Sequence, residues 1–333
     1  MKILGTLADQ SACAYYRMIL PEAELNVVHG QSTTLTMQLP VDLADPIYDV
    51  DLMVVQRIAD PNISQFLRDR FDRPVIYELD DLVMHLHRSN TMAWDYYEVD
   101  NRLEVLAETM RNADALTTTT ATLAEELSFY NERVFVLDNC LPNWVVNLNK
   151  PEHTGPVRIV YTGGPSHMDD VEHYRYGIGA TIKVLGDRVE LHTYGHPWMR
   201  ELGLTDAGHV KFRPWTMDFP SYQASLCDYD IGIAPLKNTR FNRSKSAIKV
   251  YEYWAAGVVP VVSDVDPYKV VNHGVDGMVC RTNADWREAI TALVEDPEML
   301  LRMRAAGYER VADLTIEANA HKWLDAYREV AFG

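Results

Sequence analysis

Hydrophobic and polar positions follow a regular rhythm along the first half of the chain, with short apolar runs separated by longer amphipathic stretches. The apolar runs are rich in Val, Ile and Leu, as expected of buried strands in a parallel sheet. They are Lys2–Leu7, Leu25–His29, Leu52–Gln56, Pro74–Leu79, Ala115–Thr118 and Val134–Leu137. The stretches with helical period are Cys13–Glu24, Pro61–Phe71, Met92–Asn112 and Thr120–Tyr130. This alternation predicts a parallel sheet with helices on both faces.

A polar segment with Pro and Gly, Asn143–Gly155, is typical of a linker, and the same rhythm begins again after it. The expected strands are Val157–Tyr161, Val189–Tyr194, Val210–Phe212, Asp230–Ala234, Val259–Val262 and Met278–Cys280. The expected helices are Asp169–Leu185, Phe219–Cys227, Ala247–Ala256, Ala284–Glu295, Pro297–Val311 and Ile316–Phe332. The sequence therefore predicts an α/β protein with two Rossmann-like, doubly wound domains, 1–145 and 146–312. A final helix, 313–333, is expected to pack back toward the first domain. Ligands of such sheets bind beyond the carboxyl ends of the strands.

Composition narrows the class of protein. Hydrophobic residues make up 47% and charged residues 24% of the 333 residues, which indicates a globular protein. No apolar run approaches the ~18 residues of a membrane helix, and the start of the chain does not resemble a signal peptide. The cysteines are far apart and lack metal-ligand spacing, which favours free thiols in a reducing cytoplasm. They are Cys13, Cys140, Cys227 and Cys280.

The balance of charge argues against one class of partner. The formal net charge is −17. Such an acidic surface repels phosphate backbones, and no Lys/Arg-rich run supplies a basic stripe. Free DNA or RNA is therefore disfavoured as a partner.

The segment Phe241–Asp264 is the most informative: a polar loop, a helix closed by glycine, and a buried strand. Ser244 and Ser246 are good helix N-caps, so Lys245 is expected where backbone N–H groups point outward. An ammonium group beside a helix N-terminus suits a diphosphate. Glu252 follows two turns later and can accept hydrogen bonds from ribose or sugar hydroxyls. From these residues alone, a solvated surface helix is the alternative.

The stretch Glu252-Tyr-Trp-Ala-Ala-Gly-Val-Val-Pro-Val-Val-Ser263 resembles the donor-binding motif of retaining glycosyltransferases of the GT-B fold, the group 1 family. Ser244 stands where that motif has its first glutamate, and the Ser-Lys-Ser element is similar to divergent bacterial and phage-encoded members. The resemblance is strong over 230–282 and weak but collinear elsewhere. It implies two domains facing across a cleft, with a nucleoside-diphosphate-sugar donor on the second and an acceptor on the first. It also implies transfer with retention, without cofactor or metal.

Two further segments of the second domain resemble donor-binding loops of this family. Gly163 and Gly164 follow the first strand and let the backbone approach a phosphate or sugar closely. His167 is expected to donate to the pyrophosphate, although a plain turn and a surface histidine are the alternatives. Arg213 is expected at the phosphates or the base, where an aromatic side chain can also hold the base. The expected donor-site residues are Gly163, Gly164, His167, Arg213, Ser244, Lys245, Ser246 and Glu252.

Two segments of the first domain are expected to face the donor. Arg17 opens a helix after the first strand, where it neutralises the leaving diphosphate or binds an acidic acceptor. Asp81, in Glu78-Leu-Asp-Asp81, is expected to bind an acceptor hydroxyl or to cap a helix. The two aspartates are adjacent, which differs from the Asp-x-Asp spacing of the metal site in the other glycosyltransferase fold. One of the two histidines that follow, His85 or His87, is expected to help position the acceptor, with a surface location as the alternative. The expected catalytic residues are Lys245, Arg17 and Asp81.

Three classes of function follow. The first is sugar transfer from a nucleoside-diphosphate sugar to a hydroxyl of a glycan, a protein or, in a phage-type sub-case, a modified DNA base. The second is a non-catalytic nucleotide-sugar or glycan binder, which the serine at position 244 favours. The third is a dinucleotide-dependent oxidoreductase, but Gly5-Thr-Leu-Ala-Asp-Gln-Ser11 lacks the Gly-x-Gly-x-x-Gly phosphate fingerprint that such an enzyme needs.

Overall fold

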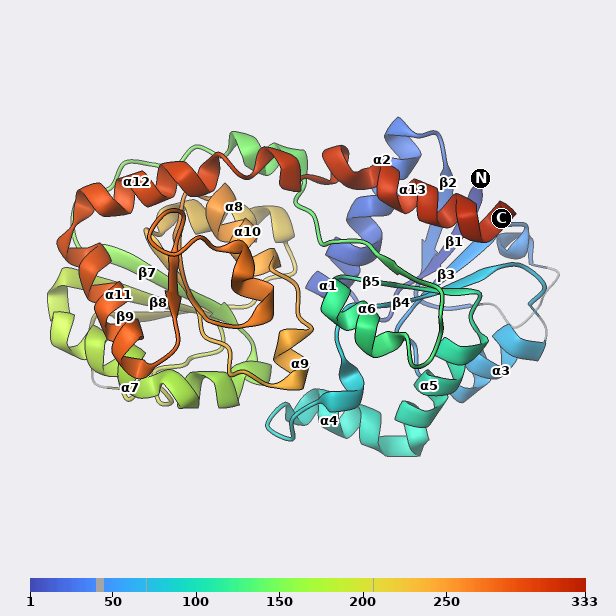
Figure 1. The fold of residues 1–333 in the computed structure, drawn as a ribbon, viewed down its shortest axis with the longest axis horizontal. Coiled ribbons are helices and arrows are strands. Elements are labelled where there is room, and N and C mark those ends of the chain that lie inside the picture. The colour runs from blue at the N-terminus through green and yellow to red at the C-terminus, as the bar shows by residue number, and fades with distance from the viewer. Residues whose placement is uncertain (40–44, 70, 206) are drawn as a thin grey trace.

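Two parallel sheets of six strands divide the chain into two α/β domains (Figure 1). The structure, a computed structural model, describes residues 1–39, 45–69, 71–205 and 207–333. The first sheet contains β1 (Lys2–Thr6), β2 (Ser32–Thr36), β3 (Leu52–Gln56), β4 (Val75–Leu79), β5 (Ala115–Thr118) and β6 (Val134–Val136) in the order β2-β1-β3-β4-β5-β6. The second contains β7 (Val157–Gly163), β8 (Val189–Gly195), β9 (Val210–Pro214), β10 (Ile231–Ala234), β11 (Val259–Ser263) and β12 (Met278–Cys280) in the order β12-β11-β10-β7-β8-β9.

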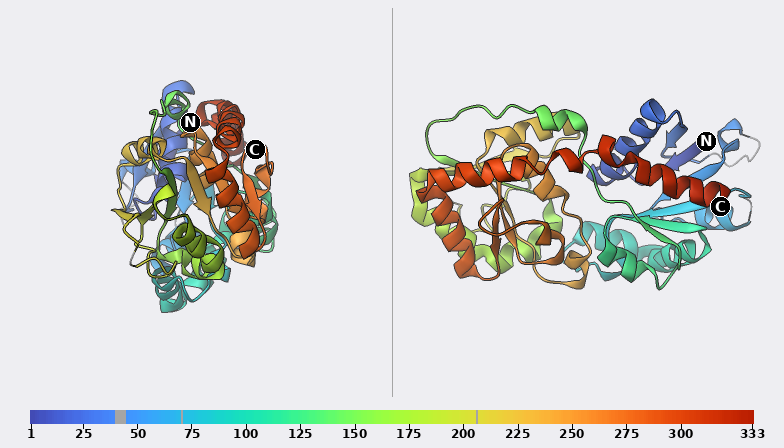
Figure 2. Two further views of the ribbon diagram at one scale, coloured as in Figure 1. Left: turned by 90° about the vertical axis from the view of Figure 1, so that its left-hand side faces the viewer. Right: turned by 45° about the horizontal axis from the view of Figure 1, so that its top comes forward.

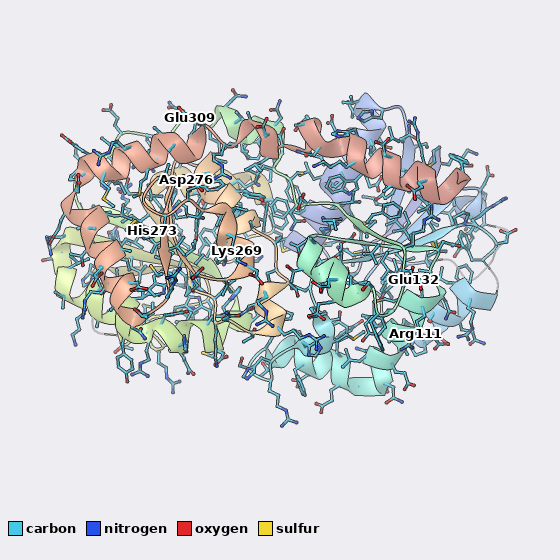
Figure 3. All side chains as sticks on the ribbon, in the orientation of Figure 1. Arg111, Glu132, Lys269, His273, Asp276 and Glu309 are labelled. Atoms are coloured by element: carbon cyan, nitrogen blue, oxygen red, sulfur yellow. The ribbon has the colours of Figure 1, made fainter. Side chains whose placement is uncertain are left out.

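Both faces of each sheet are buried. Along β3, Met53 and Val55 belong to one hydrophobic cluster of the first domain, whereas Leu52 and Val54 belong to another on the opposite face. Because successive side chains of a strand point to opposite faces, helices must cover the sheet on both sides. Figure 3 shows the side chains that fill the space between sheets and helices. The prediction of two doubly wound, Rossmann-like domains is thus confirmed.

The helices that cover the sheets fall into two sets. Those of the first domain are α1 (Ala12–Ala14), a π-helical turn (Tyr15–Ile19), α2 (Leu20–Val28), α3 (Pro61–Asp69), α4 (Thr91–Glu98), α5 (Arg102–Asn112) and α6 (Ala121–Leu127). Those that follow are α7 (Met168–Leu185), α8 (Phe219–Ser225), α9 (Arg240–Arg243), α10 (Ile248–Ala255), α11 (Asn283–Glu295), α12 (Pro297–Tyr308) and α13 (Ile316–Phe332). Within the described ranges, no helix is both long and apolar enough to cross a membrane.

The structure corrects one expected strand. Leu25–His29 is not a strand, because α2 continues to Val28 and the strand, β2, follows at Ser32–Thr36. The β-branched Val27 and Val28 suggested a buried strand, but both are exposed at the end of the helix. β2 lies at the edge of the sheet and is only partly buried. Its Ser- and Thr-rich sequence therefore lacks the apolar run that marks a central strand.

Two expected helices also differ from the structure. The helix expected at Met92–Asn112 is divided into α4 and α5, because Asp100 and Asn101 have positive φ angles of 56° and 54° between them. Such left-handed residues interrupt a right-handed helix, and Asp and Asn tolerate them best. The helix expected at Pro61–Phe71 includes residue 70, which lies outside the described residues.

The last helix lies on the first domain, although the chain before it belongs to the second. Figures 1 and 2 show α12 and α13 following one another along one side of the molecule, with α13 beside α2 and the N-terminus. Trp323 and Tyr327 of α13 are buried in the same cluster as Leu25 of α2. Tyr327 Oη also donates a hydrogen bond to Glu22 Oε1 at 3.0 Å, and Thr33 Oγ1 donates to Glu22 Oε2 at 2.7 Å. A buried carboxyl group therefore lies under the last helix.

Replacing Glu22 by glutamine is expected to stabilise the protein at pH 8. Burial raises the pKa of Glu22 from an ordinary 4.5 to about 7, although the hydrogen bonds from Thr33 and Tyr327 lower it. Because the folded state binds the Glu22 proton more tightly than the unfolded state does, protonation of Glu22 stabilises the wild-type fold. This contribution is fully present below pH ~4.5 and is lost as the pH rises through 7. The difference between the two pKa values corresponds to roughly 3 kcal/mol in the free energy of unfolding.

Urea unfolding of the wild type and the Glu22→Gln variant between pH 4.5 and 8 measures this difference. The free energy of unfolding of the wild type should fall more steeply with rising pH than that of the variant. Glu298→Gln is the matched control, because the side chain of Glu298 is 90% exposed. Parallel curves for the wild type and Glu22→Gln would contradict the expected titration.

Candidate active site

A cavity of about 250 Å³ lies between the two domains, at the carboxyl ends of β4 and β7. The first domain contributes Ala12, Cys13, Tyr16, Asp80, Asp81 and Asn139 to its wall. Seven of the residues singled out from the sequence line it as well: Asp81, Gly163, Gly164, His167, Lys245, Ser246 and Glu252. Parallel strands bind ligands at this end because loops and helix N-termini converge there.

The turn after β7 forms the floor on the second-domain side. A Cβ atom on Gly163 would lie 3.1 Å from Tyr161 Oη and 3.2 Å from the His167 ring, so a side chain has little room there. A Cβ on Gly164 would meet nothing within 4 Å. The turn therefore presents bare backbone to the cavity, which permits close approach of a phosphate or a sugar.

His167 does not have the role expected from the sequence. Its Nδ1 lies 2.9 Å from Asp170 Oδ2, and an ionised carboxylate only accepts, so Nδ1 carries the proton. Burial and then the charge of Lys249 lower the pKa of His167 to about 4, despite the hydrogen bond with Asp170. The imidazole is neutral at pH 7, which leaves Nε2 without a proton to donate to a pyrophosphate.

The loop before α10 also differs from expectation. A short extra helix, α9, ends at Arg243, and α10 begins only at Ile248, so neither Ser244 nor Ser246 caps it. Ser244 is fully buried, lies outside the cavity and donates to the carbonyl of Arg240 at 3.2 Å. Ser246 lines the cavity and accepts a hydrogen bond from Asn139 Nδ2 at 2.9 Å.

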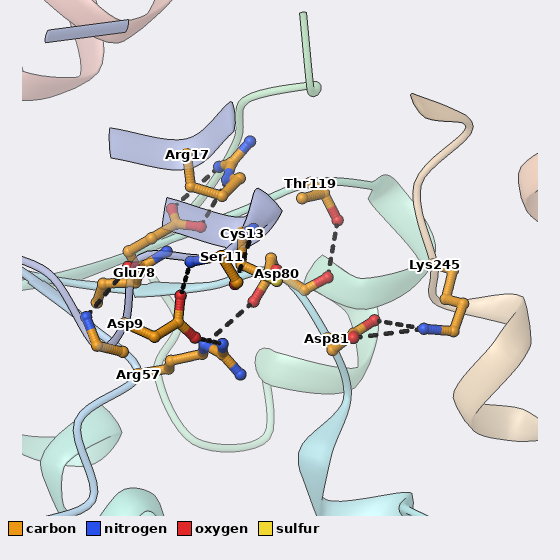
Figure 4. A network of polar contacts seen from close by, with 12 residues as sticks. Asp9, Ser11, Cys13, Arg17, Arg57, Glu78, Asp80, Asp81, Thr119 and Lys245 are labelled. Carbon is orange, nitrogen blue, oxygen red and sulfur yellow. Dashed lines mark hydrogen bonds and ion pairs between the residues drawn. The ribbon is translucent and has the colours of Figure 1, made fainter. Parts of the chain in front are cut away.

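Lys245 joins the two domains inside the cavity. Its Nζ lies 3.2 Å from Asp81 Oδ1 and 3.4 Å from Oδ2 (Figure 4). Burial lowers the pKa of Lys245, but the charge and hydrogen bond of Asp81 together with the charge of Asp170 outweigh that effect, so the pKa is raised and the group stays an ammonium ion. Burial raises the pKa of Asp81, and Lys245 opposes that shift. A partly buried ammonium paired with one carboxylate is available to a competing anion.

Lys249 is a second cation of the cavity, which the sequence interpretation missed. Its Nζ donates to the carbonyl of Thr162 at 2.6 Å, one residue before the glycine turn. Burial lowers the pKa of Lys249 to about 8. The i, i+3 spacing to Glu252 on α10 was the available signal, because residues three apart share one side of a helix.

Glu252 is held by two tyrosines. Tyr16 Oη, from the π-helical turn of the first domain, donates to Oε1 at 2.5 Å, and Tyr222 Oη donates to Oε2 at 3.1 Å. Gln223 Nε2 in turn donates to Tyr16 Oη at 2.8 Å. Burial raises the pKa of Glu252, and the tyrosine hydrogen bonds and Lys249 oppose the shift. Nothing in the sequence pattern indicated Tyr16, because its contact depends on how the domains meet.

An aromatic wall closes the second-domain side of the cavity. Trp215 is 42% exposed and lies beside Tyr222, with ring centroids 5.8 Å apart, and Phe219 stacks on Tyr15 of the first domain at 4.6 Å. Gly195 leaves room for the indole, because a Cβ there would come within 2.9 Å of Trp215. The wall offers a flat surface of the kind that holds a base.

Arg213 and Arg17 lie outside the cavity, contrary to expectation. Arg213 points to Asp228 at 3.6 Å and over the Tyr229 ring. Arg17 is 1% exposed, and both its Nε and Nη2 donate to Glu78, at 2.7 and 3.0 Å. A guanidinium that is fully committed to a buried carboxylate cannot also bind a leaving diphosphate.

The two histidines after β4 do not line the cavity either. His85 and His87 are exposed, and His87 Nδ1 contacts Ser89 Oγ at 2.8 Å. In the parts of the chain that the structure describes, no group of three or more His, Cys, Asp or Glu side chains is placed to hold a metal ion.

Residues 156–296 match the model of the family described as Glycosyl transferases group 1. This segment runs from β7 to α11 and includes the glycine turn and Lys245, Lys249 and Glu252. No curated protein matches the sequence. The chain thus contains a group 1 glycosyltransferase domain within a fold of the GT-B type.

Several solved structures share the arrangement of most or nearly all of the chain. Sucrose-phosphate synthase of Thermosynechococcus elongatus has a TM-score of 0.67 and 14% identity, over 99% of this chain and 98% of that one. Anabaena HepE in complex with UDP and glucose has a TM-score of 0.67 and 14% identity, over 98% and 99%. A mutant of TarM from S. aureus has a TM-score of 0.62 and 13% identity over 83% of this chain, which spans only 55% of TarM. At such identities the likeness establishes the fold.

Proposed function

We propose that this protein transfers a sugar from a nucleoside-diphosphate sugar to an acceptor hydroxyl, with retention at the anomeric carbon and without a metal ion. The observation that carries the proposal is the convergence of Lys245, Lys249, Glu252 and the Gly163–Gly164 turn on one cavity between the domains. Positive charge, bare backbone and a carboxylate are the groups that a diphosphate and its attached sugars require.

The two lysines are suited to the leaving group. As the glycosidic bond breaks, negative charge grows on the diphosphate, and fixed cations in a partly desolvated cavity stabilise that charge. Lys245 and Lys249 supply two such cations, so that protein groups take the place of a metal. The turn at Gly163 and Gly164 brings backbone against the phosphates.

Glu252 and Trp215 are suited to the nucleoside. The Glu252 carboxylate accepts hydrogen bonds, as it does from Tyr16 and Tyr222, and ribose hydroxyls are donors of the same kind. The exposed face of Trp215 offers a surface for the base. HepE, which shares the fold, was solved in complex with UDP and glucose. The attacking hydroxyl then arrives from the first domain, on the side of Asp80 and Asp81.

Donor binding must compete with two contacts between the domains. The diphosphate displaces Asp81 from Lys245, and a ribose hydroxyl shares Glu252 with Tyr16. Both contacts lie in the cavity and tie the domains together. We therefore infer that donor binding loosens the domains, which frees the Asp81 carboxylate for the acceptor.

A panel of UDP-, GDP-, ADP- and TDP-sugars is expected to contain at least one compound that raises the melting temperature at millimolar concentration, because ligands that bind the folded state stabilise it by mass action. Differential scanning fluorimetry measures the shift, and the matching free sugars serve as controls. If no nucleotide sugar shifts the melting temperature, the donor site is wrongly assigned.

A non-catalytic nucleotide-sugar binder is the second candidate, favoured by one observation. Ser244, at the position of the family's first glutamate, is buried outside the cavity and brings no carboxylate to the donor sugar. Release of nucleoside diphosphate from the bound donor separates the two candidates. Steady release with or without acceptor requires catalysis, whereas binding with no release supports the binder.

A further inference from the structure

Buried polar atoms without a hydrogen-bond partner gather at one edge of the first domain. Among the residues that the structure describes, twelve buried side-chain atoms find no such partner, and five of them lie at or just after the carboxyl ends of strands in the first sheet. These are Thr6 Oγ1, Gln56 Nε2, Arg57 Nε, Asp80 Oδ1 and Thr118 Oγ1. Buried polar atoms are almost always hydrogen-bonded in folded proteins. Their concentration here indicates polar partners that come from solution.

Asp80 supplies the one carboxylate oxygen in this set. Its side chain is 9% exposed, and its Oδ1 faces Arg57 Nε at 3.8 Å, too far for a hydrogen bond (Figure 4). Arg57 is held on its other side by an ion pair with Asp9, which also accepts a hydrogen bond from the Ser11 amide at 2.7 Å. Asp80 thus has an unused acceptor, and Arg57, whose Nη2 pairs with Asp9, faces two carboxylates with one positive charge.

The same edge is part of the cavity between the domains. Asp80 and Asp81 line the cavity from the first domain, and Gly164 and Lys245 line it from the second. A molecule held by Asp80 therefore lies across the cavity from the groups assigned to the donor diphosphate. This is the side from which an acceptor must approach the transferred sugar.

The charges at this edge indicate whether that molecule is an anion or is uncharged. Three carboxylates, from Asp9, Asp80 and Asp81, face two cations, Arg57 and Lys245. Arg57 is bound by Asp9, and the donor diphosphate competes for both lysines of the second-domain side, Lys245 and Lys249. A second anion would therefore meet carboxylates with no free cation, and unpaired buried charge is costly. Hydroxyl groups donate to carboxylates without that cost.

We propose that this edge binds an uncharged, polyhydroxylated acceptor, a neutral carbohydrate, and that Asp80 accepts a hydrogen bond from one of its hydroxyl groups. Arg57 is a positioning residue that holds the Asp80 carboxylate. The proposal rests on the transferase function proposed above, because it names the acceptor class of the same reaction. It excludes phosphorylated and carboxylated acceptors, and with them a DNA base in its phosphate backbone.

Binding of glucose and of glucuronate, which differ by one carboxylate on the same ring, tests the proposal. Titration by NMR is carried out with the donor pocket saturated by the nucleoside diphosphate of the sugar that gives the largest melting shift. Glucose is expected to bind at least about tenfold more tightly than glucuronate, given the unpaired carboxylates. Glucuronate binding as tightly as glucose, or no glucose binding at up to 100 mM (roughly the weakest affinity of interest), would overturn the proposal.

The Asp80→Asn variant tests the residue. It keeps the shape of the side chain but removes its charge, so the preference for glucose over glucuronate should fall to within about threefold. Asp72→Asn is the matched control, because the Asp72 side chain is 87% exposed, and it should keep the wild-type preference. An unchanged preference in Asp80→Asn contradicts the assignment of Asp80. Failure of every nucleotide sugar to bind contradicts the donor function, whereas nucleotide binding without a preference for glucose contradicts the acceptor proposal alone.

Discussion

Replacing Lys245 by methionine is expected to lower kcat/KM for sugar transfer by about 10²- to 10³-fold, the usual cost of removing one preorganised charge from a leaving-group site. The ammonium group lies in the cavity, 3.2 Å from Asp81 Oδ1, and stays charged because Asp81 raises its pKa. Methionine keeps most of the side-chain volume. Initial rates of nucleoside diphosphate release over a range of donor concentrations measure the loss.

Lys269→Met is the matched control. Lys269, labelled in Figure 3, is on the same domain, its side chain is 72% exposed, and it pairs only with Asp266 among the contacts of the described residues. Its variant should keep wild-type kinetics. Equal losses in the two variants, or a Lys245→Met protein with wild-type kinetics, would contradict a role of Lys245 at the leaving group. Melting temperatures of both variants separate a kinetic loss from unfolding.

Most of the fold could be predicted from the sequence because both sheets are buried on two faces. Central strands such as β3 and β11 are apolar up to their last residue, Gln56 or Ser263, and their alternation with helices specifies a parallel sheet. The edge strand β2 could not be predicted in this way. It is partly exposed and made of Ser, Thr and Leu, so no apolar run identifies it.

The second-domain wall of the cavity could be predicted because Lys245, Ser246 and Glu252 lie on one continuous motif. Lys245 and Glu252 are held in place by α10 and the loop before it, and local sequence specifies both. The start of the helix could not be predicted. The short helix α9 ends at Arg243, and α10 begins at Ile248 and not at the serines. Tyr16 and the Asp80–Arg57 pair could not be predicted. They depend on the contact between domains and on long-range pairing of strand ends, which no local pattern records.

Arg17 illustrates the limit of sequence reasoning most clearly, because the structure gives it a structural role. It lies on the π-helical turn, donates to both carboxylate oxygens of Glu78, and also donates to Asn139 Oδ1 at 3.1 Å and to the carbonyl of Leu137. Its guanidinium lies 5.7 Å from the ring centroid of Trp323 on α13. One buried cation thus ties together the start of the chain, β4, the segment after β6 and the last helix.

Replacing Arg17 by methionine is expected to lower the free energy of unfolding by about 3–5 kcal/mol, because Glu78 is then left buried without a countercharge. Urea unfolding at pH 7 measures the loss. Arg302→Met, at a side chain that is 67% exposed, is the control and should change stability by less than about 0.5 kcal/mol. The double variant with Glu78→Met should regain much of the loss, since an apolar pair replaces an unpaired charge. A stable Arg17→Met protein that no longer releases nucleoside diphosphate would instead return Arg17 to the reaction centre and contradict the structural role.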